Sequence, residues 1–162
     1  MDGEEIQVAG VSLQVLHTPG HTSDSVCFWI HQAQVEAATE PGAMLTGDTI
    51  LGEGTTMLDH PDGTLSDYME SLRLLGGFGG VGMCPAHGPE REDLSVMAGR
   101  YLKHREERLA QTRELIAEHR ARTDEALDAG TLGRLIYGER AQVPERVIEQ
   151  IAVSYTHLTL PT

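Results

Sequence analysis

A strand that runs directly into a Pro-Gly turn constrains this chain more than any other stretch. Residues 11–16 alternate apolar and polar side chains, which is the period of a half-buried strand. Pro19-Gly20 then ends the strand, because proline fixes φ and glycine tolerates the positive φ values that a tight turn can require. His21 follows at once, so its imidazole is predicted to lie at the mouth of a turn, where it can point into a cleft.

Two later strands are predicted to end in the same way. Residues 43–46 form a short apolar segment that leads to Asp48, and residues 81–84 form another that leads to His87 in a Pro-Ala-His-Gly turn. The three side chains are 27 and 39 residues apart, so separate strands must bring them together. Imidazole and carboxylate groups suit zinc, with manganese or iron as alternatives. We therefore predict a metal site made of His21, Asp48 and His87.

Such a site would support hydrolysis. In a two-metal site a carboxylate such as Asp48 can bridge the ions, and metal binding lowers the pKa of water to roughly 7, which allows attack on an ester, thioester or phosphodiester. Each residue alone also has an ordinary explanation, as a hydrogen-bonded histidine or a carboxylate that caps a turn. Cys84 and His87 could instead pair as nucleophile and base, but no nearby carboxylate would orient the imidazole. His17 is predicted to be structural or to support a metal ligand.

The remaining segments predict a strand-rich first part and a helical second part. Residues 32–42 are predicted to be a loop or a weak strand followed by a loop, and residues 51–63 a surface loop. A long amphipathic helix is expected from Leu94 to about His119. His104 and Arg105 are predicted to continue its polar stripe, with a position facing the cleft as the alternative. The other predicted elements are strands at 6–8 and 25–31, and helices at 64–75, with Thr64 or Ser66 as its cap, at 123–128, at 131–137 and at 143–150.

Charge and cysteine content narrow the possible functions. The net charge is −13, and residues 1–90 carry thirteen acidic side chains against a single basic one, Arg73. That region would repel a polyanion unless a bound cation reverses the local field, although the acidity can also serve solubility alone. Cys27 and Cys84 are predicted to be buried, reduced thiols. The sequence shows no apolar run long enough for a membrane span, and a cytoplasmic protein is expected.

The three turns also resemble a known pattern. Thr18-Pro19-Gly20-His21-Thr22, Leu45-Thr46-Gly47-Asp48-Thr49 and Pro85-Ala86-His87-Gly88 resemble the later motifs of the metallo-β-lactamase-fold hydrolases. The segments 47–52, 65–72, 101–108 and 131–138 are similar to the branch named for β-lactamase-like protein 2, in which a small winged-helix-like domain follows the hydrolase fold. The resemblance implies two zinc ions: His21 would complete the first site, Asp48 would bridge, and His87 would bind the second ion.

The sequence departs from that family in one respect. The family carries an earlier His-x-His-x-Asp-His motif that supplies four further metal-site residues, and this chain has no such motif. We therefore expect a fragment that is inactive alone, derived from a dinuclear zinc hydrolase acting on a small ester or thioester or on single-stranded RNA. The alternative is a non-catalytic protein whose helical region binds nucleic acid or a partner.

The expected fold is α+β, half of an αββα sandwich followed by a helical, winged-helix-like segment. Residues 1–92 would form the half sandwich and residues 93–150 the long helix and a truncated winged-helix-like domain. Residues 151–162 would be a disordered or non-native tail. Three ligands divided between two sites would bind metal weakly, and the missing half would leave an apolar sheet face exposed.

Overall fold

The computed structural model describes residues 3–31, 42–123 and 127–138, together with Ile148, Ala152, Val153 and Tyr155. These residues contain five strands and three helices. The strands are β1 (Glu5–Val8), β2 (Val11–His17), β3 (Val26–Ile30), β4 (Ala43–Gly47) and β5 (Gly82–Pro85), and the helices are α1 (Leu65–Gly76), α2 (Leu94–Arg122) and α3 (Ala129–Tyr137). Every strand expected from the apolar alternation is confirmed, with ends within one residue of the prediction.

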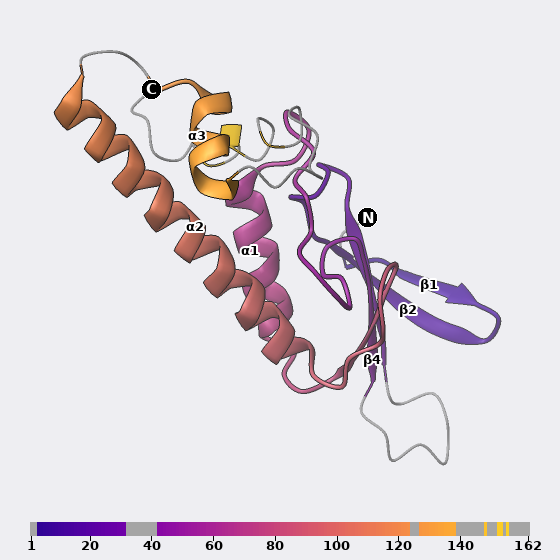
Figure 1. The fold of residues 1–162 in the computed structure, drawn as a ribbon. Coiled ribbons are helices and arrows are strands. Elements are labelled where there is room, and N and C mark those ends of the chain that lie inside the picture. The colour runs from indigo at the N-terminus through magenta and orange to yellow at the C-terminus, as the bar shows by residue number, and fades with distance from the viewer. Residues whose placement is uncertain are drawn as a thin grey trace.

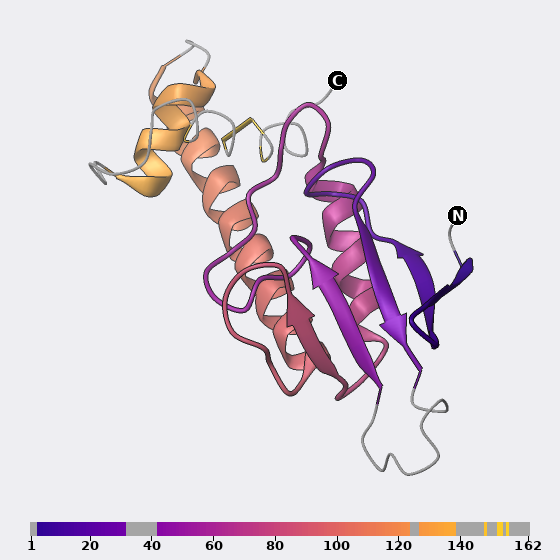
Figure 2. The same cartoon turned by 90° about the vertical axis from the view of Figure 1, so that its right-hand side faces the viewer.

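The strands form one mixed sheet in the order β1-β2-β3-β4-β5. Neighbours pair antiparallel from β1 to β4, whereas β4 and β5 are parallel. Parallel neighbours need a long crossover, and α1 lies within that connection. Helices α1 and α2 pack together on one face of the sheet (Figures 1 and 2). The expected α+β class is confirmed, and half of an αββα sandwich is consistent with this arrangement; the winged-helix-like segment stays a prediction.

The sheet face toward the helices forms the main core. Trp29, Met44 and Met83 lie opposite one another in register across three strands, and Met44 and Met83 are almost completely buried. Leu72 and Leu75 of α1 are completely buried in the same cluster. Burial of each such side chain contributes about 1.5–3 kcal/mol, so this packing holds the strand ends in place.

The opposite face of the sheet is apolar and only partly buried. Val15, Phe28, Leu45 and Cys84 form a row across four strands, since each is the register partner of the next. All four are partly exposed, so Cys84 is less buried than predicted, although both cysteines are free as expected. In Figure 2 the sheet lies in front of α1 and α2, and no described helix covers its near side.

We expect the isolated chain to self-associate through this face, because a contiguous apolar patch favours contacts that remove it from water. Replacing Val15 and Leu45 together by threonine should weaken the association about tenfold while keeping the strands intact. Sedimentation velocity at rising protein concentration measures the effect. Leu74→Gln, which removes an exposed leucine from α1, should leave the association unchanged, and a wild-type chain that stays monomeric at every concentration would contradict the prediction.

Helix α1 begins and ends as its sequence predicts. Thr64 is the N-cap, and its hydroxyl accepts a hydrogen bond from the backbone N–H of Asp67. This bond satisfies one of the amide groups left unpaired at a helix start, and the Asp67 carboxylate in the first turn complements the helix dipole. The helix buries one side against the sheet, through Leu65, Tyr68, Met69, Ser71, Leu72 and Leu75.

Helix α2 begins at an Asp93 N-cap and contributes to two hydrophobic clusters. Its first half packs into the main core, whereas Ile116 belongs to a second cluster with Leu132 and Ile136 of α3. The prediction that Arg105 continues the polar stripe is wrong, because this side chain is 5% exposed. Its guanidinium donates to the carbonyl of Thr56 and lies 5.1 Å from the ring centroid of Tyr68.

The predicted short helices need two corrections. Ala129 and Gly130 were expected to separate two helices, but both belong to α3, and Asp128 is its N-cap. The Asp128 carboxylate accepts from the backbone N–H of Thr131, which starts the helix earlier than the apolar pattern indicates. The predicted helix at 123–128 is wrong at its described ends, because Thr123 is the C-cap of α2 and Leu127 and Asp128 are not helical. Residues 124–126, most of the predicted helix at 143–150, most of the tail and the loop at 32–41 lie outside the described residues.

Length alone would let the 29 residues of α2 reach across a bilayer, but charged side chains recur along it. Among the residues described, no helix combines the length and the apolar character that a membrane span requires.

Candidate metal centre

The parallel pairing of β4 and β5 brings Asp48 and His87 together. Gly47 and Pro85 are register partners, and the backbone N–H of Ala86 donates to the Gly47 carbonyl at 3.0 Å. Both strands therefore end at the same edge of the sheet. The Nε2 atom of His87 lies 3.4 Å from Oδ1 of Asp48, and the two side chains are accessible, at 73% and 40% exposure respectively. Two predicted ligands thus meet although 39 residues separate them.

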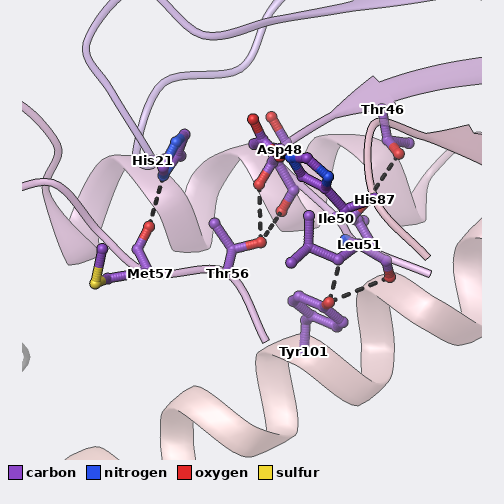
Figure 3. A network of polar contacts seen from close by, with 10 residues as sticks. His21, Thr46, Asp48, Ile50, Leu51, Thr56, Met57, His87 and Tyr101 are labelled. Atoms are coloured by element: carbon purple, nitrogen blue, oxygen red, sulfur yellow. Dashed lines mark hydrogen bonds and ion pairs between the residues drawn. The ribbon is translucent and has the colours of Figure 1, made fainter. Parts of the chain in front are cut away.

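His21 is held in a defined orientation by a backbone carbonyl. Its Nδ1 lies 2.6 Å from the carbonyl oxygen of Met57. A carbonyl only accepts, so Nδ1 carries the hydrogen of this bond, and in the neutral ring Nε2 keeps its lone pair. Histidines that bind metals commonly donate their other ring N–H in this way, which fixes the tautomer. Figure 3 shows the His21 ring against Met57, set apart from the Asp48–His87 pair.

The donor chemistry fits a divalent cation, but the number of assembled donors is small. Within the described part of the chain, no group of three or more His, Cys, Asp or Glu side chains is arranged to hold a metal ion. Catalytic zinc sites use three protein ligands and structural sites use four. The roles of His21, Asp48 and His87 as ligands therefore stay a prediction.

The loop that follows Asp48 is fastened by side chains that the sequence reasoning missed. The hydroxyl of Thr56 donates to the backbone carbonyl of Asp48 at 2.8 Å, as Figure 3 shows, and the hydroxyl of Tyr68 donates to the Thr49 carbonyl at 2.6 Å. The Tyr101 hydroxyl bonds to the backbone N–H and carbonyl of Leu51. No local motif signals these roles, because each bond joins residues from different elements or from distant parts of one loop.

The turn that carries His21 packs directly against α1. The hydroxyl of Ser71 donates to the Pro19 carbonyl at 2.7 Å, and the backbone N–H of Asp59 donates to the His21 carbonyl at 2.9 Å. His17 makes a contact that suits the structural role, one of the two expected for it: its Nε2 bonds to the Ser23 carbonyl at 2.9 Å across the turn. The turn is therefore fixed by its neighbours on both sides.

A cysteine nucleophile is disfavoured at this edge of the sheet. Burial, with the neighbouring Glu90 carboxylate as a smaller cause, raises the pKa of the Cys84 thiol above its ordinary value. The thiolate is the reactive form, so Cys84 stays protonated and unreactive near neutral pH.

Tyr68 should make the protein sensitive to alkaline pH. Burial raises the pKa of Tyr68 to about 12, although Arg105 opposes the shift. The pKa of Tyr68 is higher in the folded protein than in the unfolded chain. Its contribution to the free energy of unfolding is therefore fully present below pH 10 and falls by about 2–3 kcal/mol as the pH rises toward 12. Tyr68→Phe should cost about 1 kcal/mol at pH 8, since the Thr49 carbonyl loses its partner, and should flatten the alkaline decline. Urea unfolding at pH 8 and pH 11 measures both effects. If the wild type and Tyr68→Phe lose the same unfolding free energy between these pH values, Tyr68 is not the cause of the alkaline decline.

Comparison with known proteins identifies the family. No protein-family model matches the chain. The lactamase-like protein nscB of Neosartorya fischeri is 35% identical over 158 residues, and the β-lactamase-like protein 2 homolog of Caenorhabditis elegans is 33% identical over 118 residues, 73% of this chain and 36% of the relative. A metallo-β-lactamase family protein from Thermus thermophilus superposes with a TM-score of 0.74 at 23% identity, covering 96% of this chain and 46% of that one. The chain belongs to the metallo-β-lactamase superfamily.

The other similarities agree with this membership. A β-lactamase domain protein from Burkholderia ambifaria has the same fold, with a TM-score of 0.77 at 16% identity over 98% of this chain and 45% of that one. The atrochrysone carboxyl ACP thioesterase of Passalora fulva is 34% identical over 154 residues. The match to the nematode protein supports the β-lactamase-like protein 2 branch. The matched segments cover 92% and 91% of this chain but 44% of the nscB and thioesterase relatives, so the chain spans less than half the length of these two proteins.

Proposed function

We propose that this chain carries part of the active site of a metal-dependent hydrolase. The observation that supports the proposal is the meeting of Asp48 and His87 at 3.4 Å at the shared end of two parallel strands. His21 adds a third donor, with Nε2 left as the acceptor atom by the Nδ1 bond to Met57. A divalent cation bound there would lower the pKa of a water molecule to about 7 and so supply a nucleophile at neutral pH.

The residues of this chain have separate tasks in the proposed site. His21 and His87 would each offer one ring nitrogen, and Asp48 would offer its carboxylate oxygens. Two zinc ions are the proposed cofactor, with manganese or iron as alternatives. The three donors do not complete two sites, and the 162 residues contain no His-x-His-x-Asp-His motif. Further ligands are therefore required for catalysis, and we propose that the chain alone is inactive.

A small ester or thioester is the proposed substrate class. One relative, 34% identical, is named as an ACP thioesterase. Single-stranded RNA is less well supported, because acidic side chains accompany the basic ones on α2: Lys103 pairs with Glu107 and Arg122 with Glu118. Such alternation leaves no continuous positive stripe on those two turns to follow a phosphate backbone.

Zinc binding by the 162-residue chain tests the proposed ligands. Asp48→Ala and His87→Ala should each lower zinc affinity at least about tenfold, since each removes a ligand of an already sparse set. Isothermal titration with zinc measures the change, and His119→Ala on the last turn of α2 is the control that should leave the affinity unchanged. Equal zinc affinity in all four proteins would contradict the proposed site.

Hydrolysis by the same protein tests the second half of the proposal. With zinc added, the chain should cleave neither a thioester, nor a chromogenic β-lactam, nor single-stranded RNA above the metal-free rate. Metal-dependent turnover would contradict the proposed inactivity. A folded chain that ignores zinc but binds RNA through its helical region would favour the alternative of a non-catalytic binding protein.

A further inference from the structure

A hollow lies beside the candidate metal centre, between the loop after Asp48 and the first turns of α2. It has a volume of about 250 Å³, and its lining includes Glu53, Gly54, Arg91, Arg100, Tyr101 and His104. The loop at Gly52 forms the shared wall of the two sites: its N–H donates to the His87 carbonyl at 2.9 Å.

The lining of this hollow reverses the charge trend of the chain. Arg91, Arg100 and His104 face it with Glu53 as the single acidic residue of the lining, although the whole chain has a net charge of −13. Arg91 and Arg100 also line a neighbouring hollow, together with the carboxylates of Glu90, Glu92 and Asp93. Within the lining of the first hollow, two guanidinium groups face one carboxylate, and this arrangement favours an anionic ligand there.

The two arginines differ in how firmly they are placed. The backbone of Arg91 pairs with Met83 of β5 at 2.8 and 3.0 Å, and Nε and Nη2 of its side chain donate to the Gly52 carbonyl at 2.8 and 2.6 Å. Its remaining terminal nitrogen can serve another acceptor. Arg100 contacts the Met97 sulfur at 3.8 Å, a weak partner that leaves most of its donors for a ligand.

The third basic group contributes a hydrogen bond instead of a charge. Desolvation, together with the nearby Arg105 and Arg108, lowers the pKa of His104 below its ordinary value. The ring is therefore neutral near pH 7 and offers one N–H. Two guanidinium groups with a neutral imidazole match the oxygens of a phosphate group, which arginine binds in a planar, two-pronged geometry. Met97 and Tyr101 add apolar surface for the stem of the ligand.

We propose that this hollow binds a phosphate ester at the non-reacting end of a thioester substrate. This inference rests on the proposed hydrolase function, because the hollow adjoins Asp48 and His87 through Gly52. Binding of the remote phosphate would hold the substrate in place and so position its thioester bond for hydrolysis. The phosphopantetheine arm of a carrier-protein thioester and the backbone of RNA both carry such a phosphate. The test must therefore separate these two sources.

Ligand binding without turnover provides the test. The 162-residue chain is titrated in EDTA with inorganic phosphate, 4′-phosphopantetheine, pantetheine and a short single-stranded oligoribonucleotide, and amide NMR shifts are followed. We expect 4′-phosphopantetheine to bind about tenfold more tightly than pantetheine, with the largest shifts at Gly52, Gly54 and Thr55. Arg100→Gln should abolish this preference. Arg73→Gln, which removes the same charge from α1, should keep it.

Several outcomes would overturn the inference: equal binding of pantetheine and 4′-phosphopantetheine, equal losses in Arg100→Gln and Arg73→Gln, or tighter binding of the oligoribonucleotide that depends on Arg100. Arg91→Gln is a second variant and should also lose the preference for 4′-phosphopantetheine. If its melting temperature equals that of the wild type, the lost preference is not caused by a disturbed Gly52 loop. The two proposals fail separately, because this binding needs no metal. A chain that ignores zinc can still prefer the phosphate ester, and a chain without that preference can still bind zinc.

Discussion

Gly20→Ala is expected to lower the free energy of unfolding by about 2–6 kcal/mol, because the substitution combines backbone strain with overpacking. Gly20 has a φ of +138°, which side-chain-bearing residues rarely adopt, and a Cβ atom there would lie 2.3 Å from Cα of Tyr68. Tyr68 cannot move aside freely, since it is completely buried and its hydroxyl is bonded to the Thr49 carbonyl. The turn and α1 must therefore separate, and His21 moves with the turn.

Urea unfolding at pH 8 measures this loss. Gly79→Ala is the matched control, because Gly79 also has a positive φ, +76°, but an added Cβ would meet nothing within 4 Å. It should cost only the strain, about 1 kcal/mol. Equal losses in the two variants would show that the close approach of Tyr68 to the turn has no energetic consequence.

Gly52→Ala is expected to disturb the other side of the candidate metal centre. A Cβ atom at Gly52 would lie 2.0 Å from the carbonyl oxygen of Pro89 and 2.8 Å from the carbonyl carbon of Gly88. Both atoms belong to the backbone of the turn after His87, so the turn has to shift away from the Asp48 loop. We expect a loss of about 1–3 kcal/mol in unfolding free energy from overpacking. Zinc affinity should fall about tenfold, as it does when support for a ligand is lost.

Titration with zinc and urea unfolding of the same samples separate the two effects. Gly99→Ala is the control, because Gly99 lies in α2 with open space around it. This variant should gain about 0.5–1 kcal/mol from the higher helix propensity of alanine and keep its zinc affinity. If Gly52→Ala binds zinc like the wild type, the contact between the two turns does not position Asp48 and His87.

The strands and the two long helices could be predicted because their signals are local. Alternation with period two places residues 11–16 in a strand, and Thr64 caps α1 through a bond to an amide three residues later. Arg105 shows where this reasoning fails. A charged residue within a polar stretch is normally solvated, yet here a carbonyl from the Thr56 loop and the ring of Tyr68 bury it. Those partners lie in other elements, and no sequence window contains them.

The candidate metal centre could likewise be predicted only in part from the sequence. The amino-acid order predicts which side chains stand at strand ends, because glycine and proline act on the backbone of their immediate neighbours. It therefore identified His21, Asp48 and His87 as candidates. Contacts between distant segments bring Asp48 and His87 together, orient the His21 ring on the Met57 carbonyl, and bond Thr56 to the Asp48 backbone. These contacts depend on the parallel pairing of β4 with β5 and on the packing of α1 against the first turn, and long-range packing leaves no periodic signal in the chain.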